Sequence, residues 1–212
     1  MIQRLGQSGP TVSQTVARME RDGLLTVEGD RHLELTERGQ ALATRVMRKH
    51  RLAECLLIDV IGLDWEDVHS EACRWEHVMS EAVERRILDI LGHPTESPYG
   101  NPIPGLAELG DPQGPGSYLD GLASLDRVAQ DAPAQVVVRR IGEPAQYDTE
   151  IMARLRRAGV RPGAAVAVRL TGARAGEVLV GSGGEVVELT RELASHVFVD
   201  ADVSVQPDRA TH

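Results

Sequence analysis

The feature that most constrains this chain is a run of metal-binding side chains between residues 69 and 77. His69, Cys73, Glu76 and His77 stand at positions i, i+4, i+7 and i+8. On a helix of about 3.6 residues per turn, this spacing places them all on one face. Imidazole, thiolate and carboxylate groups bind transition metals, and on an otherwise apolar face they need a partner. The run therefore predicts a helix that contributes ligands to a metal centre.

A second pair of donors, His50 and Glu54, stands at i and i+4 on the preceding predicted helix. Two packed helices would then offer six donor groups to one or two divalent cations. The alternative is structural, since single His and Glu side chains are mostly solvated or hydrogen-bonded and Cys behaves as a small hydrophobe. Six donors on two helices favour the metal centre. Cys55, in the apolar run 55–58, is interpreted as a buried hydrophobe.

The composition narrows the class of protein. A length of 212 residues allows one or two domains, or three small ones, and aromatic residues at 3% require an aliphatic core. We recognise no secretory leader and no run of about 18 apolar residues, so no membrane partner is expected. The two cysteines, Cys55 and Cys73, do not suggest a disulfide framework, and a cytoplasmic location is expected.

The net charge of −9 is unevenly distributed along the chain. Residues 1–51 contain nine Lys and Arg against six Asp and Glu, a balance of +3, whereas residues 52–212 contain 14 against 26, a balance of −12. A basic end on an acidic body is typical of a DNA-binding head. The excess of three is small, so it supports this interpretation only together with local motifs.

The basic end predicts a helix followed by a hairpin. Pro10 stands at the first helical position, an apolar stripe of Val12, Val16 and Met19 follows, and Gly23 ends the helix. The opposite face carries groups suited to base edges and phosphates: Thr11, Gln14, Thr15, Arg18 and Arg21. Alternating segments at 25–27 and 33–35 indicate a hairpin with Arg31 at its tip. This is the winged helix-turn-helix order, although the helix alone would also fit an ordinary amphipathic helix.

Long helical patterns follow the hairpin. We expect one helix from about Glu37 to Ile61, ended by Gly62, a second from Asp64 to about Glu81, and a third around 87–91. Their apolar surface exceeds what a monomer needs, so a helix-mediated homodimer is expected. Six of the eleven prolines lie between residues 92 and 116, which indicates an ordered loop to about Leu109 and then a linker.

From residue 135 the pattern changes to short strands. Valine-rich segments at 136–138, 166–168, 178–180, 186–187 and 197–199 alternate with turns, and one helix is expected from Thr149 to Ala158. Five short strands predict a small SH3-like barrel. The predicted fold class is therefore α+β. Its domains are a partial winged helix-turn-helix head at 1–43, a helical metal-binding and dimerisation domain at 44–110, a linker at 111–132 and the barrel at 133–206.

Six segments of the chain resemble the diphtheria-toxin-repressor family of iron-dependent transcriptional regulators, and its mycobacterial branch closely. They are Gln7–Val16, Arg18–Leu25, Gly29–Thr36, Val46–Glu54, Glu71–Glu81 and Ser97–Gly105. The likeness extends over nearly the whole chain, strongly to residue 109 and more loosely in the barrel. It implies a homodimer that binds double-stranded operator DNA when loaded with ferrous iron and represses genes of iron homeostasis.

The resemblance also implies particular site residues, with two metal sites per chain. His50, Glu54 and His69 correspond to an ancillary site completed by Glu143 and Gln146 of the barrel, whereas Cys73, Glu76 and His77 correspond to a primary, activating site. Ser8, Pro10, Thr11 and Gln14 correspond to recognition-helix contacts, and Arg51, Ser97 and Asn101 resemble an anion-binding cluster. The mixed donors suit Fe²⁺, with Mn²⁺, Co²⁺, Ni²⁺ or Zn²⁺ able to bind in vitro.

The chain departs from the family at its start. The family has a helix and most of a second one before this point, and that segment would supply a methionine ligand to the primary site. We expect the recorded start to lie downstream of the true one. Alternative functions are a metal-binding dimer that has lost DNA binding, or a Mn²⁺-responsive regulator. An enzyme is not expected, because the sequence lacks H-E-x-x-H, G-x-S-x-G and P-loop motifs.

Overall fold

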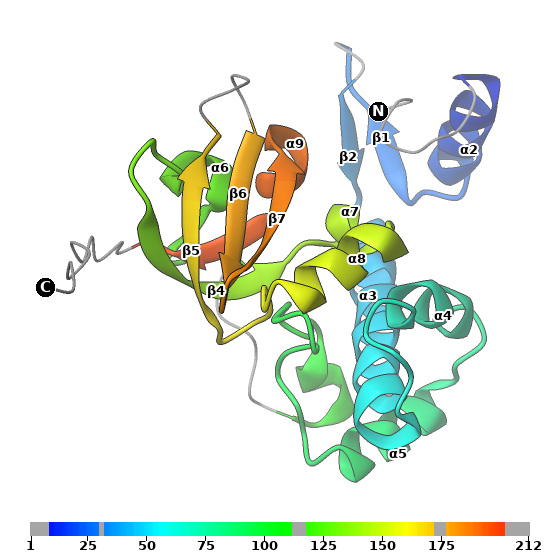
Figure 1. Ribbon diagram of the computed structural model, residues 1–212. Coiled ribbons are helices and arrows are strands. Elements are labelled where there is room, and N and C mark those ends of the chain that lie inside the picture. Colours follow the sequence, from blue (N-terminus) through cyan, green and yellow to red (C-terminus); the bar gives the residue numbers. More distant parts are fainter. Residues whose placement is uncertain (1–8, 30–31, 112–117, 172–176, 202–212) are drawn as a thin grey trace, which may run out of the picture. The chain divides into compact units, whose positions relative to one another are not determined.

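The computed structural model describes residues 9–29, 32–111, 118–171 and 177–201 (Figure 1). These residues belong to two units, 1–47 and 48–212, each of which is described by itself. Two of the predicted DNA contacts, Ser8 and Arg31, lie outside the described residues.

The first unit consists of a helix, a hairpin and the start of a long helix. α2 (Gly9–Arg21) includes Pro10 near its start and ends before Gly23, whose φ of +66° is a left-handed conformation that glycine adopts freely. β1 (Leu25–Val27) and β2 (Leu33–Leu35) pair antiparallel, with Leu25 opposite Leu35. The predicted order of helix and hairpin is confirmed.

Thr36 and Gly39 tie the hairpin to the next helix, α3 (Glu37–Leu56). The Thr36 hydroxyl donates to the Gly23 carbonyl at 2.8 Å and accepts from the Gly39 amide at 3.0 Å, as an N-cap residue does. A Cβ at Gly39 would lie 1.9 Å from the Leu24 carbonyl oxygen. A residue without a side chain therefore allows α3 to begin this close to the chain before β1.

Few side chains are buried in the described part of the first unit. The apolar stripe of α2, Val12, Val16 and Met19, is half-buried, and no residue of this helix is fully buried. Leu25 is the buried hydrophobic side chain of residues 9–29 and 32–47. The polar face of α2 is consequently left in solvent.

The first predicted helix ends where expected, at Ile61 before Gly62, whereas the second does not end where predicted. α3 is followed by a π-helical turn, η1 (Leu57–Ile61), and the left-handed Gly62 ends it. The expected single helix from Asp64 to Glu81 is wrong, since the structure has α4 (Val68–Trp75) and then α5 (Glu81–Ile90). Ser80 is the N-cap of α5, because its side chain accepts a hydrogen bond from the Val83 amide. A short 3₁₀ helix, η2 (Leu106–Leu109), completes this part.

The described barrel sheet has six strands instead of the five predicted. They are β3 (Leu122–Ser124), β4 (Ala134–Ile141), β5 (Ala165–Leu170), β6 (Glu177–Ser182), β7 (Glu185–Thr190) and β8 (Val197–Asp200), in the antiparallel order β3-β8-β4-β5-β6-β7. β3 and α6 (Leu125–Val128) lie in the range that the sequence assigned to the linker. β3 forms by pairing with the distant β8, a contact that no local pattern reveals.

Three further short helices belong to the barrel: α7 (Glu143–Gln146), α8 (Thr149–Arg157) and α9 (Arg191–Ala194). α8 confirms the helix predicted from Thr149, and Asp148 caps it by accepting hydrogen bonds from the amides of Glu150 and Ile151. α7 lies in a segment for which no helix was predicted. The helical part and the barrel together confirm the predicted α+β class.

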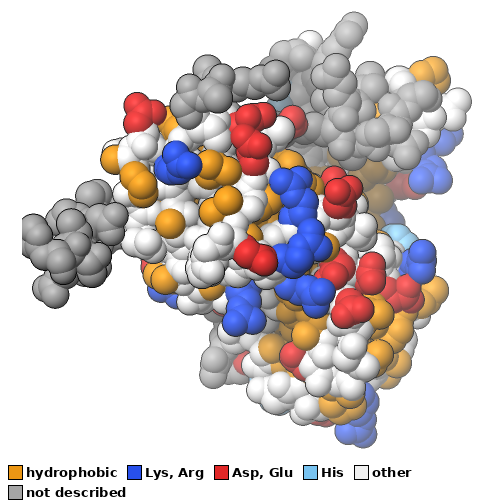
Figure 2. All heavy atoms as spheres, viewed as in Figure 1, with side chains coloured by type: hydrophobic (Ala, Val, Ile, Leu, Met, Phe, Trp, Pro, Cys, Tyr) orange, Lys and Arg blue, Asp and Glu red, His pale blue; other side chains and the backbone are white. Residues whose placement is uncertain are grey.

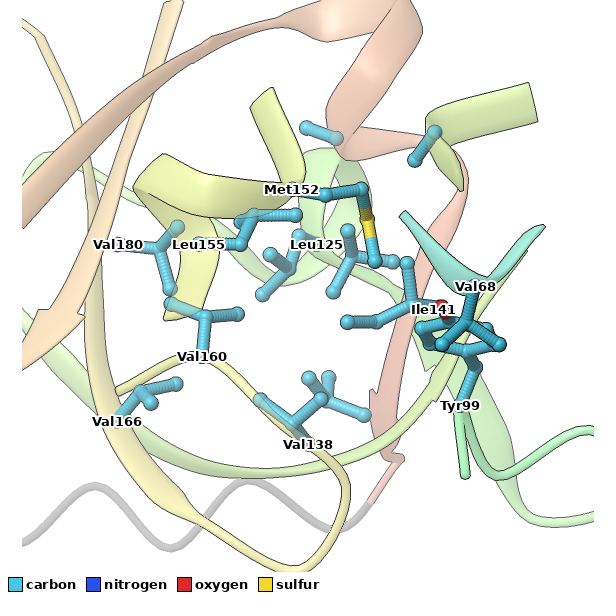
Figure 3. Packing of buried hydrophobic residues seen from close by; sticks show 14 of the residues in the cluster. Val68, Tyr99, Leu125, Val138, Ile141, Met152, Leu155, Val160, Val166 and Val180 are labelled. Carbon is cyan, nitrogen blue, oxygen red and sulfur yellow. The ribbon is translucent and has the colours of Figure 1, made fainter. Parts of the chain in front are cut away.

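The hydrophobic core continues from the helices into the barrel. Val68 of α4 and Tyr99 lie beside Ile141 of β4, and all three side chains are fully buried (Figure 3). The Ile141 amide donates to the Tyr99 carbonyl at 2.9 Å. At Gly100, where φ is +77°, a Cβ would lie 1.9 Å from the Arg139 carbonyl oxygen. The loop after α5 therefore packs backbone against backbone on β4, and this contact holds the barrel against the helices.

The face of the molecule shown in Figure 2 carries mixed charge, with a column of basic side chains between acidic ones. The last turn of α8 contains Arg154, Arg156 and Arg157, and Arg156 forms an ion pair with Glu66 at 3.1 Å. No helix within the described ranges is long and apolar enough to cross a bilayer.

Candidate metal centre

Two helices bring four of the predicted ligands into one cluster. His50 and Glu54 come from successive turns of α3, and His69 and Cys73 come from successive turns of α4. The His50 Nε2 atom lies 2.9 Å from Glu54 Oε1 and 3.1 Å from His69 Nδ1. The His69 Nε2 atom lies 3.6 Å from the Cys73 sulfur. The two imidazoles and Glu54 are at most 3% exposed, so they need one another or a cation as partners.

Glu76 and His77 lie at and beyond the end of α4. Glu76 is the C-cap residue, and its Oε2 atom lies 2.8 Å from His50 Nδ1, so it contacts the ring nitrogen that Glu54 does not. His77 is 71% exposed, with its Nε2 atom 3.5 Å from Glu76 Oε1. Because α4 ends at Trp75, His77 leaves the helical face that the i+8 spacing assumed. That part of the sequence interpretation is wrong.

The donor atoms fit a divalent cation. Within the described residues, the ligand atoms of His50, His69 and Cys73 lie within 4.8 Å of one another. Glu54 Oε2 is buried and has no hydrogen-bond partner in the described part of the chain. Two imidazoles, a thiolate and a carboxylate suit Fe²⁺, Co²⁺, Ni²⁺ or Zn²⁺ better than Mg²⁺. Ligands predicted for two separate sites are in contact here, since Cys73 touches His69 and Glu76 touches His50.

The groups of this cluster shift one another's pKa values. Burial alone would lower the pKa of His50, but hydrogen bonds to Cys73 and Glu54 outweigh it and raise that pKa to about 10. The same balance of burial against bonds to Cys73 and Glu54 raises the pKa of His69 to about 9. Hydrogen bonds from His50 and His69 lower the pKa of the Cys73 thiol to about 7. These shifts favour protons on the imidazoles and a thiolate at Cys73, and a bound metal would have to compete with those protons.

The barrel places Glu143 and Gln146 near the helices through α7, which lies beside α3 in Figure 1. Glu143 Oε1 accepts from the Arg51 guanidinium at 2.9 Å instead of belonging to the His50 cluster. The Gln146 side chain is buried and donates to the Ile141 carbonyl at 2.6 Å. Its Oε1 atom is buried without a hydrogen-bond partner within the described ranges, so it is an available oxygen donor.

The three residues of the predicted anion cluster have protein partners in this structure. Arg51 also donates to the Pro102 carbonyl, and its Nε is buried without a partner among the residues described. Buried Ser97 accepts from the Tyr99 amide at 3.3 Å. Asn101 donates to the Ile141 carbonyl and accepts from the Tyr118 hydroxyl, both at 2.9 Å. Ser97 and Asn101 thus help to fix the loop against the barrel.

Two features of the site were missed by the sequence interpretation. The Tyr147 ring lies edge-to-face against the His69 ring, with centroids 4.7 Å apart. Arg48, on α3 two residues before His50, is buried in an ion-pair network with Glu84 and Glu108. The sequence could have indicated Tyr147, because it directly follows the predicted ligand Gln146. The partners of Arg48 lie too far along the chain to be recognised from the sequence.

The predicted DNA face lies on α2 of the first unit. Its described members are all exposed: Pro10, Thr11, Gln14, Arg18 and Arg21. Two of them, Arg18 and Arg21, lie in the last turn of the helix. This polar and basic face opposes the half-buried apolar stripe, as the sequence predicted.

The chain combines a helix-and-hairpin head, a cluster of His, Cys and Glu side chains, and a small barrel. This combination is typical of metal-dependent DNA-binding regulators. Family models agree with each part. Residues 2–33 match the N-terminal DNA binding domain of iron dependent repressors, residues 36–105 match their metal binding and dimerisation domain, and residues 130–201 match the FeoA domain.

Individual relatives agree with the family models. The chain is 59% identical over 200 residues to the iron-dependent repressor IdeR of Mycobacterium tuberculosis, covering 94% of this chain and 86% of the relative. It is 48% identical over 205 residues to the diphtheria toxin repressor of Corynebacterium diphtheriae, with the same two coverages. The chain therefore belongs to the iron-dependent repressor family, which consists of metal-dependent transcriptional repressors and not of enzymes.

Solved structures share this fold. A manganese-dependent transcriptional repressor in complex with manganese has a TM-score of 0.71 at 27% identity, over 93% of this chain and 87% of that chain. The IdeR of T. acidophilum has a TM-score of 0.70 at 26% identity, over 95% of this chain and 87% of that chain. The predicted combination of head, helical domain and SH3-like barrel is thus confirmed.

Proposed function

We propose that this chain is an Fe²⁺-dependent repressor that binds operator DNA as a homodimer and controls genes of iron homeostasis. The observation that carries the proposal is the buried convergence of His50, Glu54, His69 and Cys73 from α3 and α4. Family membership supports the regulatory role, because the relative from Mycobacterium tuberculosis named above is an iron-dependent repressor. Its proposed place of action is the cytoplasm.

We assign the metal ligands in two sets per chain. His50, Glu54 and His69 would hold one ion, with Glu143 and Gln146 as oxygen donors from the barrel. Cys73, Glu76 and His77 would hold the second, activating ion. Bound metal would supply positive charge that replaces the protons now shared among these groups. Glu143 would have to leave Arg51 to act as a ligand. Gln146 Oε1, which has no hydrogen-bond partner among the described residues, supports an oxygen donor at that side.

The thiolate of Cys73 favours iron as the physiological ion. Thiolate is a softer ligand than carboxylate, and a set with a thiolate suits Fe²⁺ better than Mn²⁺. The structural relative that carries manganese keeps a Mn²⁺ response as the second candidate. Competition of Fe²⁺ and Mn²⁺ for the same operator response would separate the two.

The DNA partner is assigned to α2 and the hairpin. Ser8, Pro10, Thr11 and Gln14 would contact bases and phosphates, with Arg18, Arg21 and Arg31 as phosphate contacts. Each phosphate contact by an arginine contributes to a salt-dependent affinity. Arg51, Ser97 and Asn101 are proposed to bind a small anion beside the metal centre.

A homodimer is supported by exposed apolar side chains on the helical part of the second unit. These are Val60, Ile61, Val78, Val83 and Ile90. They belong to η1, to α5 and to the turn between α4 and α5, within residues 36–105 that match the dimerisation domain. Burying such side chains between two copies would remove apolar surface from water.

The test is operator binding followed by fluorescence anisotropy, with Fe²⁺ under anaerobic conditions and with a chelator. We expect Fe²⁺ to strengthen operator binding by about 5- to 150-fold, the usual range for coupling between two sites. Equal binding with and without metal would refute the switch. Metal binding with no DNA binding under any condition would instead favour the metal-binding dimer.

A further inference from the structure

Tyr147 contacts a proposed metal ligand from the barrel side. Its ring and the His69 ring have centroids 4.7 Å apart and planes 86° apart, the edge-to-face arrangement of an aromatic pair. The other ring against His69 is that of His50, at 4.8 Å and 64°. The His69 imidazole is therefore held between a ring of α3 and a ring that follows α7 of the barrel.

Both nitrogens of His69 face groups of the cluster, which makes its orientation important. Nδ1 lies 3.1 Å from His50 Nε2, and Nε2 lies 3.6 Å from the Cys73 sulfur. A rotation of this ring would move one nitrogen away from its partners. The contact with Tyr147 opposes that rotation.

Tyr147 also differs from the cluster in its exposure to solvent. Its side chain is exposed, whereas His50, Glu54 and His69 are buried and Cys73 is half-buried.

We propose that Tyr147 is a positioning residue that fixes the His69 imidazole in the metal centre, which strengthens metal binding and slows exchange of the ion. The inference rests on the proposed metal centre and adds a residue that supplies no ligand atom. An edge-to-face pair contributes about 2- to 12-fold in an equilibrium constant, which corresponds to about 0.5–1.5 kcal/mol.

The experiment uses the full chain, Co²⁺ as the probe, and three variants: Tyr147→Ala, Tyr147→Leu and Tyr147→Phe. Co²⁺ affinity follows from the absorption of the bound ion, and its release rate from stopped-flow mixing with EDTA. We expect the Ala and Leu variants to bind Co²⁺ about 2- to 12-fold more weakly and to release it faster. The Phe variant, which keeps the ring, is expected to behave like the wild type.

A second readout uses the metal-free protein, where a ligand role could not contribute. The ¹⁵N and ¹H NMR signals of the His69 ring are expected to shift in the Ala and Leu variants and to stay in place in the Phe variant. Because Tyr147 is exposed, all three variants are expected to keep the wild-type circular dichroism spectrum.

The outcomes separate this inference from the proposed function. If the wild type does not bind Co²⁺, the proposed function is overturned together with the inference. If the wild type binds Co²⁺ and the Ala variant matches it in affinity, release rate and His69 signals, only the inference is overturned. A Phe variant as weak as the Ala variant would also overturn it, since the hydroxyl and not the ring contact would then matter.

Discussion

Replacing Arg48 should be among the most destabilising single changes in the second unit. Arg48 and Glu84 are each 1% exposed, and Arg48 Nε lies 2.6 Å from Glu84 Oε2. The guanidinium also donates to the Gly105 carbonyl at 2.8 Å and to Glu108 at 3.1 Å. The network thereby joins α3 to α5 and to the segment of η2, at a position two residues before His50.

The magnitude follows from what Arg48→Met leaves behind. The Glu84 carboxylate would remain buried, with Lys49 at 3.9 Å as its remaining ion pair in the described part of the chain. Breaking a buried ion pair by removing one partner costs about 3–5 kcal/mol. Glu108 is 40% exposed, so loss of that second pair should add at most about 1 kcal/mol. The total loss is then about 3–6 kcal/mol, and at about 2–4 °C per kcal/mol for a unit of this size, Tm should fall by about 6–24 °C.

The assay is urea unfolding of the metal-free chain followed by circular dichroism, which avoids stabilisation by bound metal. Arg48→Met with Glu84→Leu is the matched control, because replacing a whole buried pair by apolar side chains is often neutral or stabilising relative to the broken pair. We expect the double variant to recover most of the loss. A cost below about 1 kcal/mol for Arg48→Met, or a double variant as unstable as the sum of its parts, would refute the reasoning.

Three further predictions concern single residues. The pKa of Cys73 is lowered to about 7, so its reaction with iodoacetamide should have a midpoint near that pH, and Fe²⁺ or Co²⁺ should protect it. Buried Cys55, with its pKa raised to about 12, should stay unmodified in the native protein. Mass spectrometry of both peptides checks this, and a Cys73 that metal does not protect would count against ligation. Gly100→Ala should destabilise the chain by more than about 1 kcal/mol in urea unfolding, because φ is +77° and the added Cβ would meet the Arg139 carbonyl. Gly92→Ala should lower the free energy of unfolding by less, because φ is +69° there but no atom lies within 4 Å of the added Cβ. Ser80→Ala should lower stability by about 1 kcal/mol through loss of the α5 cap, and Ser80→Asp should retain it; equal stability of all three would contradict the cap.

Local patterns in the sequence were sufficient for much of this fold. Pro10 and Gly23 bounded α2, the alternation of apolar residues marked β1 and β2, and the helix predicted from Thr149 to Ala158 agrees with α8. In each case the signal lies within a few residues of the element that it defines. The i, i+4 spacing likewise paired His50 with Glu54 and His69 with Cys73, since both pairs lie inside a helix.

The spacing argument failed where the helix ended. Its extension to i+8 assumed that α4 continues through His77, but α4 stops at Trp75 and the cap at Ser80 begins a new helix. Competition between continuing one helix and starting another is decided by packing and capping, which a periodic pattern does not record. β3 was missed for a related reason, because three residues form a strand only by pairing with β8.

The sequence by itself determined which donor groups this protein has and on which helical turns they lie, because periodicity within a helix is a property of neighbouring residues. Only the tertiary structure decided which donors meet. It joined His69 and Glu76 to His50, gave Glu143 to Arg51 and placed Tyr147 against His69. These contacts link α3, α4 and the barrel across long separations in the chain, and they depend on how whole elements pack around a shared hydrophobic core.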